Sequence, residues 1–325
     1  MKCPSCEGSV LETFTKTIEK VMNLRKDVCI FCGESPGNMV ITENGYCGDK
    51  CSKCELIYIS PHPTNEEVVN LYEFDKGLAS SHLLSYIGRI PKAKYHLGII
   101  KKFISNGSLL EIGVGSGTFL SEAQKQGFEV YGIELNVIQA DFVKNQLDIP
   151  CEDVPLYASS FGGRQFDIVY HCDVLSHFNN PISEFIKIHS RLKKGGFLIF
   201  QTGNIGEIDR KYYKWFSSFQ YPHHLYFFSQ NSLKLLLKKS GFEYLSSFNF
   251  SLLAKLALDK IVMRLLKQRI NNGISSSGYS HNSTLFSKIV TTVFYSIDFL
   301  LSYKIGSLLP KQGKPQTIIV VAQKV

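Results

Sequence analysis

The sequence of 325 residues contains no stretch of 18 uninterrupted apolar residues. Its first ten residues, MKCPSCEGSV, also lack the long apolar segment of a secretory signal. These absences argue against a membrane-spanning helix and against secretion. We therefore expect a cytoplasmic, reducing location, in which the nine cysteines are thiols or metal ligands.

The sequence has no dense run of Lys or Arg, although its formal net charge is +8. A positive charge of this size suits an acidic small molecule such as a nucleotide-linked sugar, an anionic membrane surface, or RNA. Without a basic run, nucleic acid is the weakest of these partners. The contents of 44% hydrophobic and 20% charged residues are those of an ordinary soluble globular protein. The length predicts one domain of about 200 to 250 residues with a small accessory module.

The most informative segment is Leu109 to Leu120, with the sequence LLEIGVGSGTFL. An apolar pair leads to Glu111, and Gly113, Gly115 and Gly117 follow at every second position. Glycine takes up positive φ without a Cβ clash and lets the backbone pass close to a ligand. The segment therefore predicts a strand, a tight turn and a helix, the layout of a nucleotide-binding α/β unit.

The glycine pattern does not fit a dinucleotide fingerprint, because Thr118 stands where that fingerprint needs Gly or Ala. The E-x-G-x-G-x-G arrangement instead resembles motif I of class I S-adenosylmethionine (SAM) methyltransferases. The resemblance implies that Glu111, Ser116 and the three glycines bind SAM. The alternative is a glycine turn without a ligand.

A second predicted strand, Phe128 to Ile133, ends in Glu134, about 20 residues past the glycine loop. A carboxylate at this place can accept hydrogen bonds from both ribose hydroxyls. The resemblance implies that Glu134 binds the ribose of SAM, that Leu135 packs on the adenine, and that His171 adds a further contact to the cofactor. The alternative for Glu134 is an exposed acid that caps a helix.

Two later apolar runs, Phe166 to Tyr170 and Phe197 to Thr202, predict further strands. Between them we expect a helix over Ile182 to Leu192 and a KKGG turn. Alternating strands and helices predict an α/β, doubly wound sheet with ligands at the carboxyl ends of the strands. The resemblance implies a seven-stranded, Rossmann-like methyltransferase sheet, in which the last strand, Thr317 to Ala322, runs antiparallel between strands five and six.

Seven of the nine cysteines lie within the first 54 residues. Two C-x-x-C knuckles with about 18 residues between them predict a four-cysteine zinc site. A closed shell of four thiolates leaves no open position, so this zinc would be structural. The predicted ligands are Cys29, Cys32, Cys51 and Cys54.

The other N-terminal cysteines leave alternatives open. Cys3, Cys6 and Cys47 are either part of a second site or free of metal. The spacing of Cys47, Cys51 and Cys54 also resembles the iron–sulfur motif of radical SAM enzymes. That alternative would require a barrel of βα units, whereas the later sequence predicts an open sheet.

The segment Cys51 to Asp75 contains PHPTNEEVVNLYEFD. It resembles the zinc-ribbon exit and the helix that precede the methyltransferase core in a bacterial and archaeal group often encoded in polysaccharide biosynthesis clusters. Sugar C-methyltransferases share this zinc module but carry a longer C-terminal domain, which this chain lacks. The resemblance implies an N-terminal zinc ribbon, and it favours a nucleotide-linked or lipid-linked sugar as the methyl acceptor.

The segment Tyr221 to Leu237 reads YPHHLYFFSQNSLKLLL and follows the fifth predicted strand. Adjacent histidines at this place lie where an acceptor is expected, and imidazole can take a proton at neutral pH. A similar H-x-x-Y/F-F-S segment in sugar C-methyltransferases implies His224 as the catalytic base, with Tyr226 and His223 beside it. The alternative is that His224 only pins the loop.

Other residues near these segments have secondary roles in this interpretation. His171 and Asp173, directly after the fourth strand, are second candidates for contact with the acceptor, and we expect His177 to pack beneath the loop. Ser229 is the predicted N-cap of the following helix.

We divide the chain into a cysteine-rich zinc-binding module at 1–60, connecting helices at 61–105 and a SAM-dependent methyltransferase domain at 106–325. A helical insert at about 251–310 interrupts the pattern of the sheet. The first of its two helix-like stretches has a basic side formed by Lys255, Lys260, Arg264, Lys267 and Arg269. The insert is either a lid or dimer face that packs on the core, or a helix that lies on a membrane surface.

Together these patterns predict a zinc-ribbon methyltransferase that uses SAM and Zn²⁺ and acts on a small-molecule acceptor, with a nucleotide-linked or lipid-linked sugar favoured. One alternative is an RNA methyltransferase that grips RNA with the ribbon. Another is a SAM-binding scaffold without catalysis.

Overall fold

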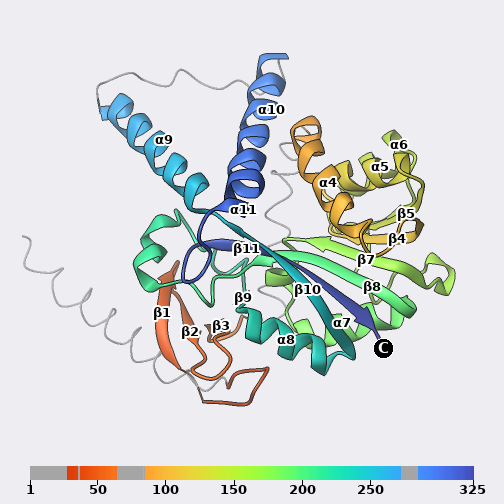
Figure 1. The fold of residues 1–325 in the computed structure, drawn as a ribbon, viewed down its shortest axis with the longest axis horizontal. Helices are drawn as coiled ribbons and strands as arrows, with labels where there is room; N and C mark the ends of the chain where they lie inside the picture. The colour runs from red at the N-terminus through yellow and green to blue at the C-terminus, as the bar shows by residue number, and fades with distance from the viewer. Residues whose placement is uncertain (1–27, 36, 64–82, 84, 272–284) are drawn as a thin grey trace, which may run out of the picture.

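A seven-stranded sheet forms the centre of the computed structural model, which describes residues 28–35, 37–63, 83, 85–271 and 285–325 (Figure 1). Its strand order is β10-β11-β8-β7-β4-β5-β6. The strands are β4 (Gly107–Ile112), β5 (Phe128–Ile133), β6 (Cys151–Glu152), β7 (Phe166–Cys172), β8 (Leu192–Gly203), β10 (Phe242–Ser251) and β11 (Gln316–Lys324). Pairs among β4 to β8 are parallel, whereas β11 runs antiparallel to its neighbours β8 and β10. The predicted mostly parallel sheet, with its last strand between the fifth and sixth, is confirmed.

Helices cover both faces of this sheet. One face is covered by α4 (Tyr86–Ile100) and α5 (Thr118–Lys125), with α6 (Val137–Gln146) beyond them, and the other by α7 (Pro181–Arg191) and α8 (Gln230–Lys239) (Figure 1). Side chains alternate between the two cores along each strand: Leu109 packs in the core with α4 and α5, and Leu110 in the core with α7 and α8. Because both faces are buried, the central strands are continuous apolar runs.

Helix boundaries follow from local capping groups. The side-chain oxygens of Asn136 and Asn180 accept hydrogen bonds from backbone N–H groups three residues later, at the start of α6 and α7. The predicted N-cap Ser229 accepts from Ser232 N at 2.9 Å and forms a capping box. The predicted helix at Ile182 to Leu192 is α7, and the expected KKGG turn is instead part of β8, which begins at Leu192.

The cysteine-rich segment forms a second, antiparallel sheet of order β1-β2-β3-β9. Its first three strands are β1 (Asn38–Glu43), β2 (Tyr46–Lys50) and β3 (Ile57–Ser60), and the fourth is β9 (Tyr226–Phe227), from the predicted acceptor segment. The module at 1–60 therefore shares a sheet with the main domain. Residues 1–27 and 64–82, which include Cys3, Cys6 and much of the predicted connecting region, lie outside the described residues.

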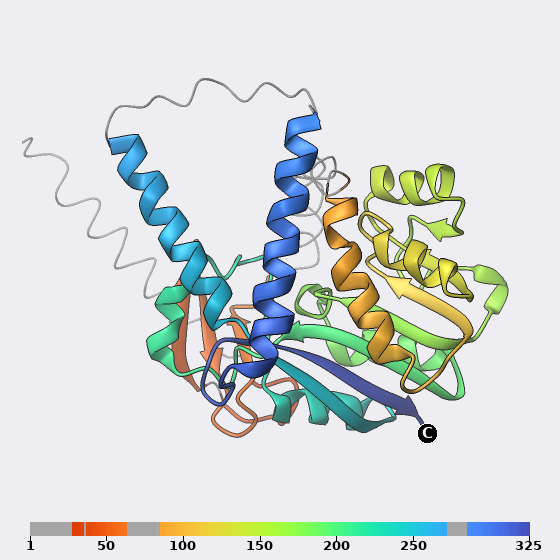
Figure 2. The ribbon, with the colours of Figure 1, turned by 45° about the horizontal axis from the view of Figure 1, so that its top comes forward.

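The insert between β10 and β11 forms two helices that project from the body of the molecule (Figure 2). They are α9 (Leu253–Asn271) and α10 (Leu285–Phe299), and α10 continues through a π-helical turn, η5 (Leu300–Ile305), into the short α11 (Gly306–Leu308). The stretch Ile289–Leu308 has a mean hydropathy of 1.2 and is long and apolar enough to cross a membrane. The absence of an unbroken apolar run therefore did not exclude such a helix, because a few polar residues are tolerated in it.

Candidate active site

The three glycines after β4 all have positive φ, at 75°, 58° and 73° for Gly113, Gly115 and Gly117. A Cβ at Gly113 would lie 2.5 Å from Val174 Cγ2, and one at Gly117 would lie 2.5 Å from Leu147 Cδ1. At Gly115 the nearest atom would be 3.9 Å away. The first and third glycines are therefore required by close packing as well as by φ, whereas the backbone at Gly115 borders open space. A ligand could therefore lie against the backbone at Gly115, and a side chain there would narrow the space for it.

Glu134 lies at the carboxyl end of β5, beside the glycine loop. Its carboxylate accepts hydrogen bonds from the backbone N–H groups of Gly115, at 2.8 Å, and Asn136, at 2.9 Å. Burial raises the pKa of Glu134, and these two hydrogen bonds offset the effect only in part. The structure thus brings the predicted ribose-binding carboxylate to the predicted loop.

Glu111 lies at the end of β4, with only 4% of its surface exposed. Burial and then the negative charge of Glu134 raise the pKa of Glu111 well above its usual range. Its Oε2 atom has no hydrogen-bond partner among the described residues. A buried carboxyl oxygen without a partner, next to a second carboxylate and an open loop, fits a ligand that carries positive charge.

The remaining predicted cofactor residues take different positions. Ser116 is buried, and its hydroxyl is paired with that of Thr118 at 2.9 Å. Thr118 in turn donates to the backbone oxygen of Tyr86 in α4, which ties the loop to that helix. Leu135 is 53% exposed, and Val137 and Ile138, at the start of α6, are exposed to a similar degree.

The structure does not bring His171, a predicted cofactor contact, to the glycine loop. The His171 side chain is fully buried and stacks on Phe200, with ring centroids 5.0 Å apart, against α7. Neighbouring Tyr170 faces α4 and α5, so strand alternation turns His171 to the opposite face of the sheet from Glu111. Burial lowers the pKa of His171 to about 3, which keeps the imidazole neutral.

Asp173 follows β7 with a φ of 59°, which is rare for a residue other than glycine. Both of its carboxylate oxygens accept from Gln201 Nε2, at 2.9 and 3.1 Å, and one accepts from Lys92 Nζ at 3.3 Å. Although about half of the Asp173 side chain is exposed, partial desolvation raises its pKa, and the charge of Lys92 and the bonds from Gln201 outweigh this effect and lower the pKa overall. A carboxylate is thus held ionised at the carboxyl end of β7, one strand from the glycine loop.

His224 lies close to this carboxylate and to His177. The rings of His224 and His177 are 4.7 Å apart, and Leu225 N donates to Ser176 O at 2.8 Å, which joins the two segments. Burial, followed by the neighbouring His177, lowers the pKa of His224 to about 4. The imidazole is therefore neutral at pH 7 and has a free electron pair for a proton. His223, the adjacent residue, is half-buried.

The predicted catalytic role of Tyr226 does not fit its surroundings. Tyr226 is part of β9, pairs with Tyr58 of β3 and is 2% exposed. Its hydroxyl is 3.0 Å from His62 Nε2 and donates to Asn179 O at 3.1 Å. These bonds join the cysteine-rich sheet to the main domain, so the side chain is structural.

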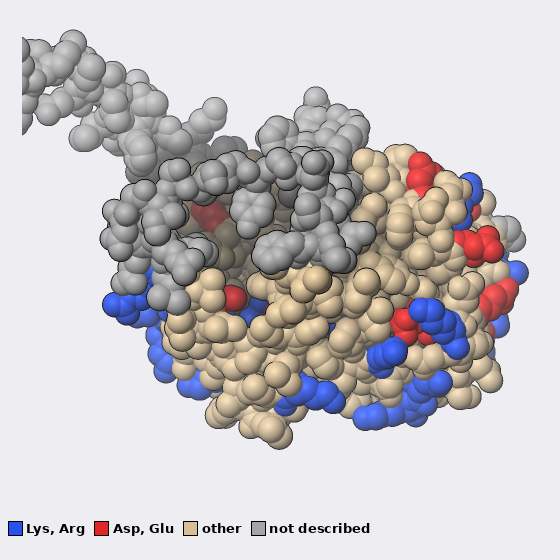
Figure 3. Space-filling view, turned by 90° about the horizontal axis from the view of Figure 1, so that it is seen from above, with Lys and Arg blue, Asp and Glu red and all other residues tan. Residues whose placement is uncertain are grey.

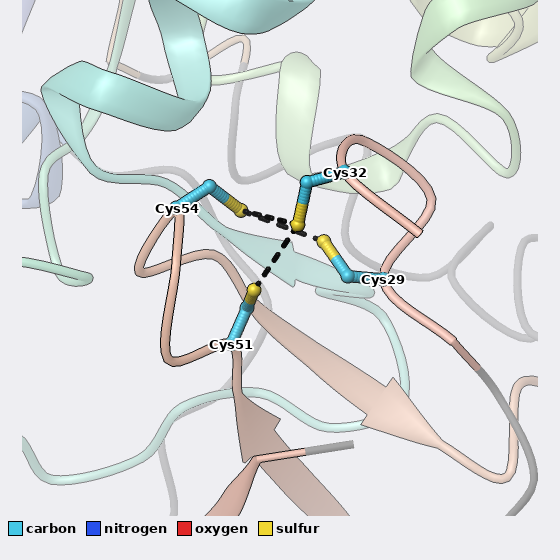
Figure 4. A group of neighbouring side chains, drawn as sticks. All are labelled: Cys29, Cys32, Cys51 and Cys54. Atoms are coloured by element: carbon cyan, nitrogen blue, oxygen red, sulfur yellow. Dashed lines mark hydrogen bonds between the residues drawn. The ribbon is translucent and has the colours of Figure 1, made fainter. Parts of the chain in front are cut away.

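The four predicted zinc ligands converge on one point (Figure 4). Their sulfur atoms all lie within 4.8 Å of one another, with 3.4 Å between Cys29 and Cys54 and between Cys32 and Cys51. A tetrahedral zinc with bonds of about 2.3 Å places its sulfur ligands about 3.8 Å apart, so the thiols fit this geometry. Cys47 lies on β2 outside the cluster, so the C-x-x-x-C-x-x-C set does not gather around one point.

Comparisons with known proteins identify the central part of the chain. Residues 88–247 match a family described as a methyltransferase domain. The match supports a SAM-dependent methyltransferase domain in this part of the chain. The chain is 32% identical over 101 residues to a ubiquinone biosynthesis O-methyltransferase of Ruegeria pomeroyi, a match that covers 30% of this chain and 41% of that protein. It is 28% identical over 150 residues to a tRNA U34 carboxymethyltransferase of Vibrio cholerae, covering 43% of this chain and 46% of that protein.

These matches span less than half of either relative. Among solved structures, a cyclopropane synthase of Mycobacterium tuberculosis is similar with a TM-score of 0.47 and 15% identity, and the match covers 73% of this chain and 84% of that one. The family match over residues 88–247 supports the predicted enzyme class.

Sequence reasoning missed several residues of the methyltransferase domain that surround the site. Lys92 and Gln201 come from α4 and β8, and neither stands in a recognisable motif. Only the strand order brings them to Asp173. Val137 and Ile138 could have been found from the sequence. They are two apolar residues directly after the N-cap Asn136, close to the predicted adenine contact Leu135.

Proposed function

We propose that the protein transfers a methyl group from SAM to a small-molecule acceptor, and that the acceptor is a sugar carried by a nucleotide or a lipid. The methyltransferase family match of residues 88–247 supports the reaction class. The observation that carries the choice of cofactor is the pair of acidic residues, Glu111 and Glu134, beside the open backbone at Gly115.

The charge of this pair distinguishes SAM from a dinucleotide. The negative charge of Glu134 raises the cost of ionising the buried Glu111, so a cationic ligand is favoured next to them and an anionic pyrophosphate is disfavoured. SAM carries a sulfonium and an ammonium group. Glu134 would accept hydrogen bonds from the ribose hydroxyls, and Leu135, Val137 and Ile138 would form the apolar surface for the adenine.

The acceptor would lie at the carboxyl ends of β4 and β7, where these neighbouring strands end side by side. SAM supplies an already activated methyl group, so alignment of the acceptor accounts for much of the rate. His224 is neutral at pH 7 and would take the acceptor proton, and the ionised Asp173 nearby stabilises the imidazolium that results. His223 and Asp173, whose side chain is about half exposed, would add polar groups beside the acceptor.

The preference for a phosphate-linked sugar rests on the resemblance of the Cys51 to Asp75 segment and on the net charge of +8. The test is a screen of nucleotide sugars and lipid-linked sugars with SAM labelled in its methyl group. Transfer of label to a sugar, lost in His224→Ala, supports the proposal. Transfer only to the nucleotide or lipid part of these compounds, or to none of them, contradicts it.

A second candidate acceptor is RNA, which the similarity to a tRNA carboxymethyltransferase over 43% of this chain favours. RNA binding through phosphates would weaken steeply as the salt concentration rises, with a slope set by the number of phosphates contacted. Methylation of a tRNA pool with such a salt dependence would replace the sugar proposal.

We also propose that Cys29, Cys32, Cys51 and Cys54 hold one structural zinc ion. Support comes from their sulfur spacing and from the two knuckle turns, in which Gly33 N donates to Cys29 O and Glu55 N to Cys51 O. The zinc would orient the sheet that contains β9 and so fix the segment that precedes it, which carries His224.

A further inference from the structure

The helices α9 and α10 expose an unusual amount of apolar surface. On α10 and at the first residue of η5, six large apolar side chains are 42–56% exposed: Ile289, Val290, Val293, Phe294, Ile297 and Leu300. They recur at spacings of three and four, so they form one stripe along the helix. Leu258, Ile261 and Val262 form a similar exposed stripe on α9. We call these nine side chains the hairpin stripe.

The hairpin stripe is separate from the surface that holds α10 to the domain. A Cβ on Gly88 of α4 would lie 2.8 Å from Tyr295 Cβ and 3.2 Å from the backbone of Thr292, so the two helices pack closely there. Arg89 donates to the Tyr295 hydroxyl at 3.1 Å and also lies over its ring. These contacts hold α10 against α4, whereas the apolar side chains of the stripe remain exposed on the surface of the helix.

Basic residues accompany the stripe. Helix α9 carries five Lys or Arg residues and one Asp along its length. Lys255 is paired with Asp259 and Asp298, but Lys260 lies over the Trp215 ring and Arg264 is exposed. Figure 3 views the molecule from above, with Lys and Arg along its left and lower edges and, together with most of the visible Asp and Glu, at its right edge. Apolar surface beside an excess of positive charge matches a layer of anionic lipid headgroups over acyl chains.

From these observations we propose that the hairpin stripe docks the protein on an anionic membrane surface. A second copy of the chain is a weaker occupant, because a two-fold contact through this hairpin would bring two basic α9 helices together. The proposal concerns where the protein resides and does not depend on the identity of the methyl acceptor.

The helices lie on the membrane and do not cross it. The 15 residues of α10 span about 22 Å at 1.5 Å per residue, which is less than the hydrocarbon core of about 30 Å. The apolar stretch beyond α10 belongs to the domain, since Ser302, Tyr303 and Gly306 are buried there. Tyr303 donates to Gln201 and packs on Phe250, so this end cannot enter lipid without unfolding the site.

The test uses the full chain and flotation with vesicles of phosphatidylcholine, with or without phosphatidylglycerol. We expect binding to vesicles that contain phosphatidylglycerol and little binding to phosphatidylcholine alone. Phe294→Glu should lower the fraction bound about tenfold or more, because it places a charge where an exposed apolar ring would insert into the lipid. Lys260→Glu with Arg264→Glu should lower it by a similar factor, and added salt should reduce binding of the wild type.

Matched controls lie on the opposite face of the domain. Ile186→Glu on α7 replaces an apolar residue 51% exposed, and Lys238→Glu on α8 reverses an exposed charge, so both should leave vesicle binding unchanged. Thermal unfolding of each variant checks that the fold is intact. No binding to anionic vesicles at low salt, or equal loss in the controls, overturns the proposal. A dimer in sedimentation that Phe294→Glu dissociates, without vesicle binding, assigns the stripe to a second copy instead.

Discussion

The Glu134 carboxylate accepts a hydrogen bond from the backbone N–H of Gly115, at 2.8 Å. This contact joins the ends of two neighbouring parallel strands, β4 and β5, across the point where the cofactor is expected. It places an acidic side chain and an open stretch of backbone at one site, and the predictions for cofactor binding follow from it.

Substitutions at these two residues should weaken SAM binding in different ways. Glu134→Ala removes charge-assisted hydrogen bonds and should weaken SAM about 10- to 100-fold in calorimetry. Gly115→Arg should abolish SAM binding, because the arginine side chain would fill the open space beside the backbone. The protein itself has room for a Cβ there, since the nearest atom would be 3.9 Å away. Glu129→Ala, at the exposed side of the same strand, serves as the control and should bind SAM normally. Tight NADH binding without SAM binding would refute the cofactor assignment.

The buried Glu111 should make stability depend on pH. Its pKa in the folded protein is raised above 4.5, so the folded state binds the proton more tightly than the unfolded state. The contribution of protonated Glu111 to the free energy of unfolding is complete below about pH 4.5. It is lost as the pH rises through the raised pKa of Glu111 in the folded protein. Without SAM, Glu111→Gln should therefore gain stability relative to the wild type as the pH rises. Denaturant unfolding over a pH series measures this, and parallel curves for the two proteins would contradict it.

Removal of the His224 imidazole should slow catalysis without loss of cofactor binding. If His224 is the base, His224→Ala lowers kcat by about a hundredfold or more, while the affinity for SAM is unchanged. Because the pKa of His224 is about 4, the base stays neutral at higher pH, and kcat/KM should not fall near pH 6.5. Tyr226→Phe is the comparison, since its hydroxyl is bonded to His62 and Asn179 and its loss should spare kcat. Full activity in His224→Ala would assign His224 to the loop alone.

Metal analysis should find about one zinc ion per chain. Cys32→Ser should lose it, and chelation should loosen the cysteine-rich sheet more than the main domain. Cys47→Ser is the matched control, because Cys47 is a buried thiol of the same sheet outside the cluster. An active protein that contains no metal, or a brown iron–sulfur chromophore, would show that the zinc assignment is wrong.

Much of the cofactor side could be predicted because its signals are local. The glycines, Glu111 and Glu134 lie at strand ends, and strand ends are marked in sequence by apolar runs followed by turn residues. Parallel strands then bring these ends to one edge of the sheet, where Glu134 contacts the glycine loop at Gly115. The side chain of His171 was assigned to the wrong face of the sheet. The face depends on the position in the strand, and a shift of one residue turns a side chain to the opposite face.

The acceptor side was less predictable, since its contacts join distant segments. Asp173 is held by Lys92 and Gln201, residues that are 81 and 28 positions away. Tyr226 looked catalytic beside His224, but its segment supplies a strand to the cysteine-rich sheet. A two-residue strand has no periodicity of its own and forms only because β3 offers it an edge.

By itself, the sequence determined the parallel α/β sheet, the glycine loop with its acidic partner, and the pairs of cysteines, because periodicity and spacing act within short stretches of chain. Only the tertiary structure decided that β9 completes the second sheet, that His171 is buried and His224 lies beside His177, and that the hairpin stripe is exposed. These depend on which surfaces cover one another, and burial is a property of the whole packed chain.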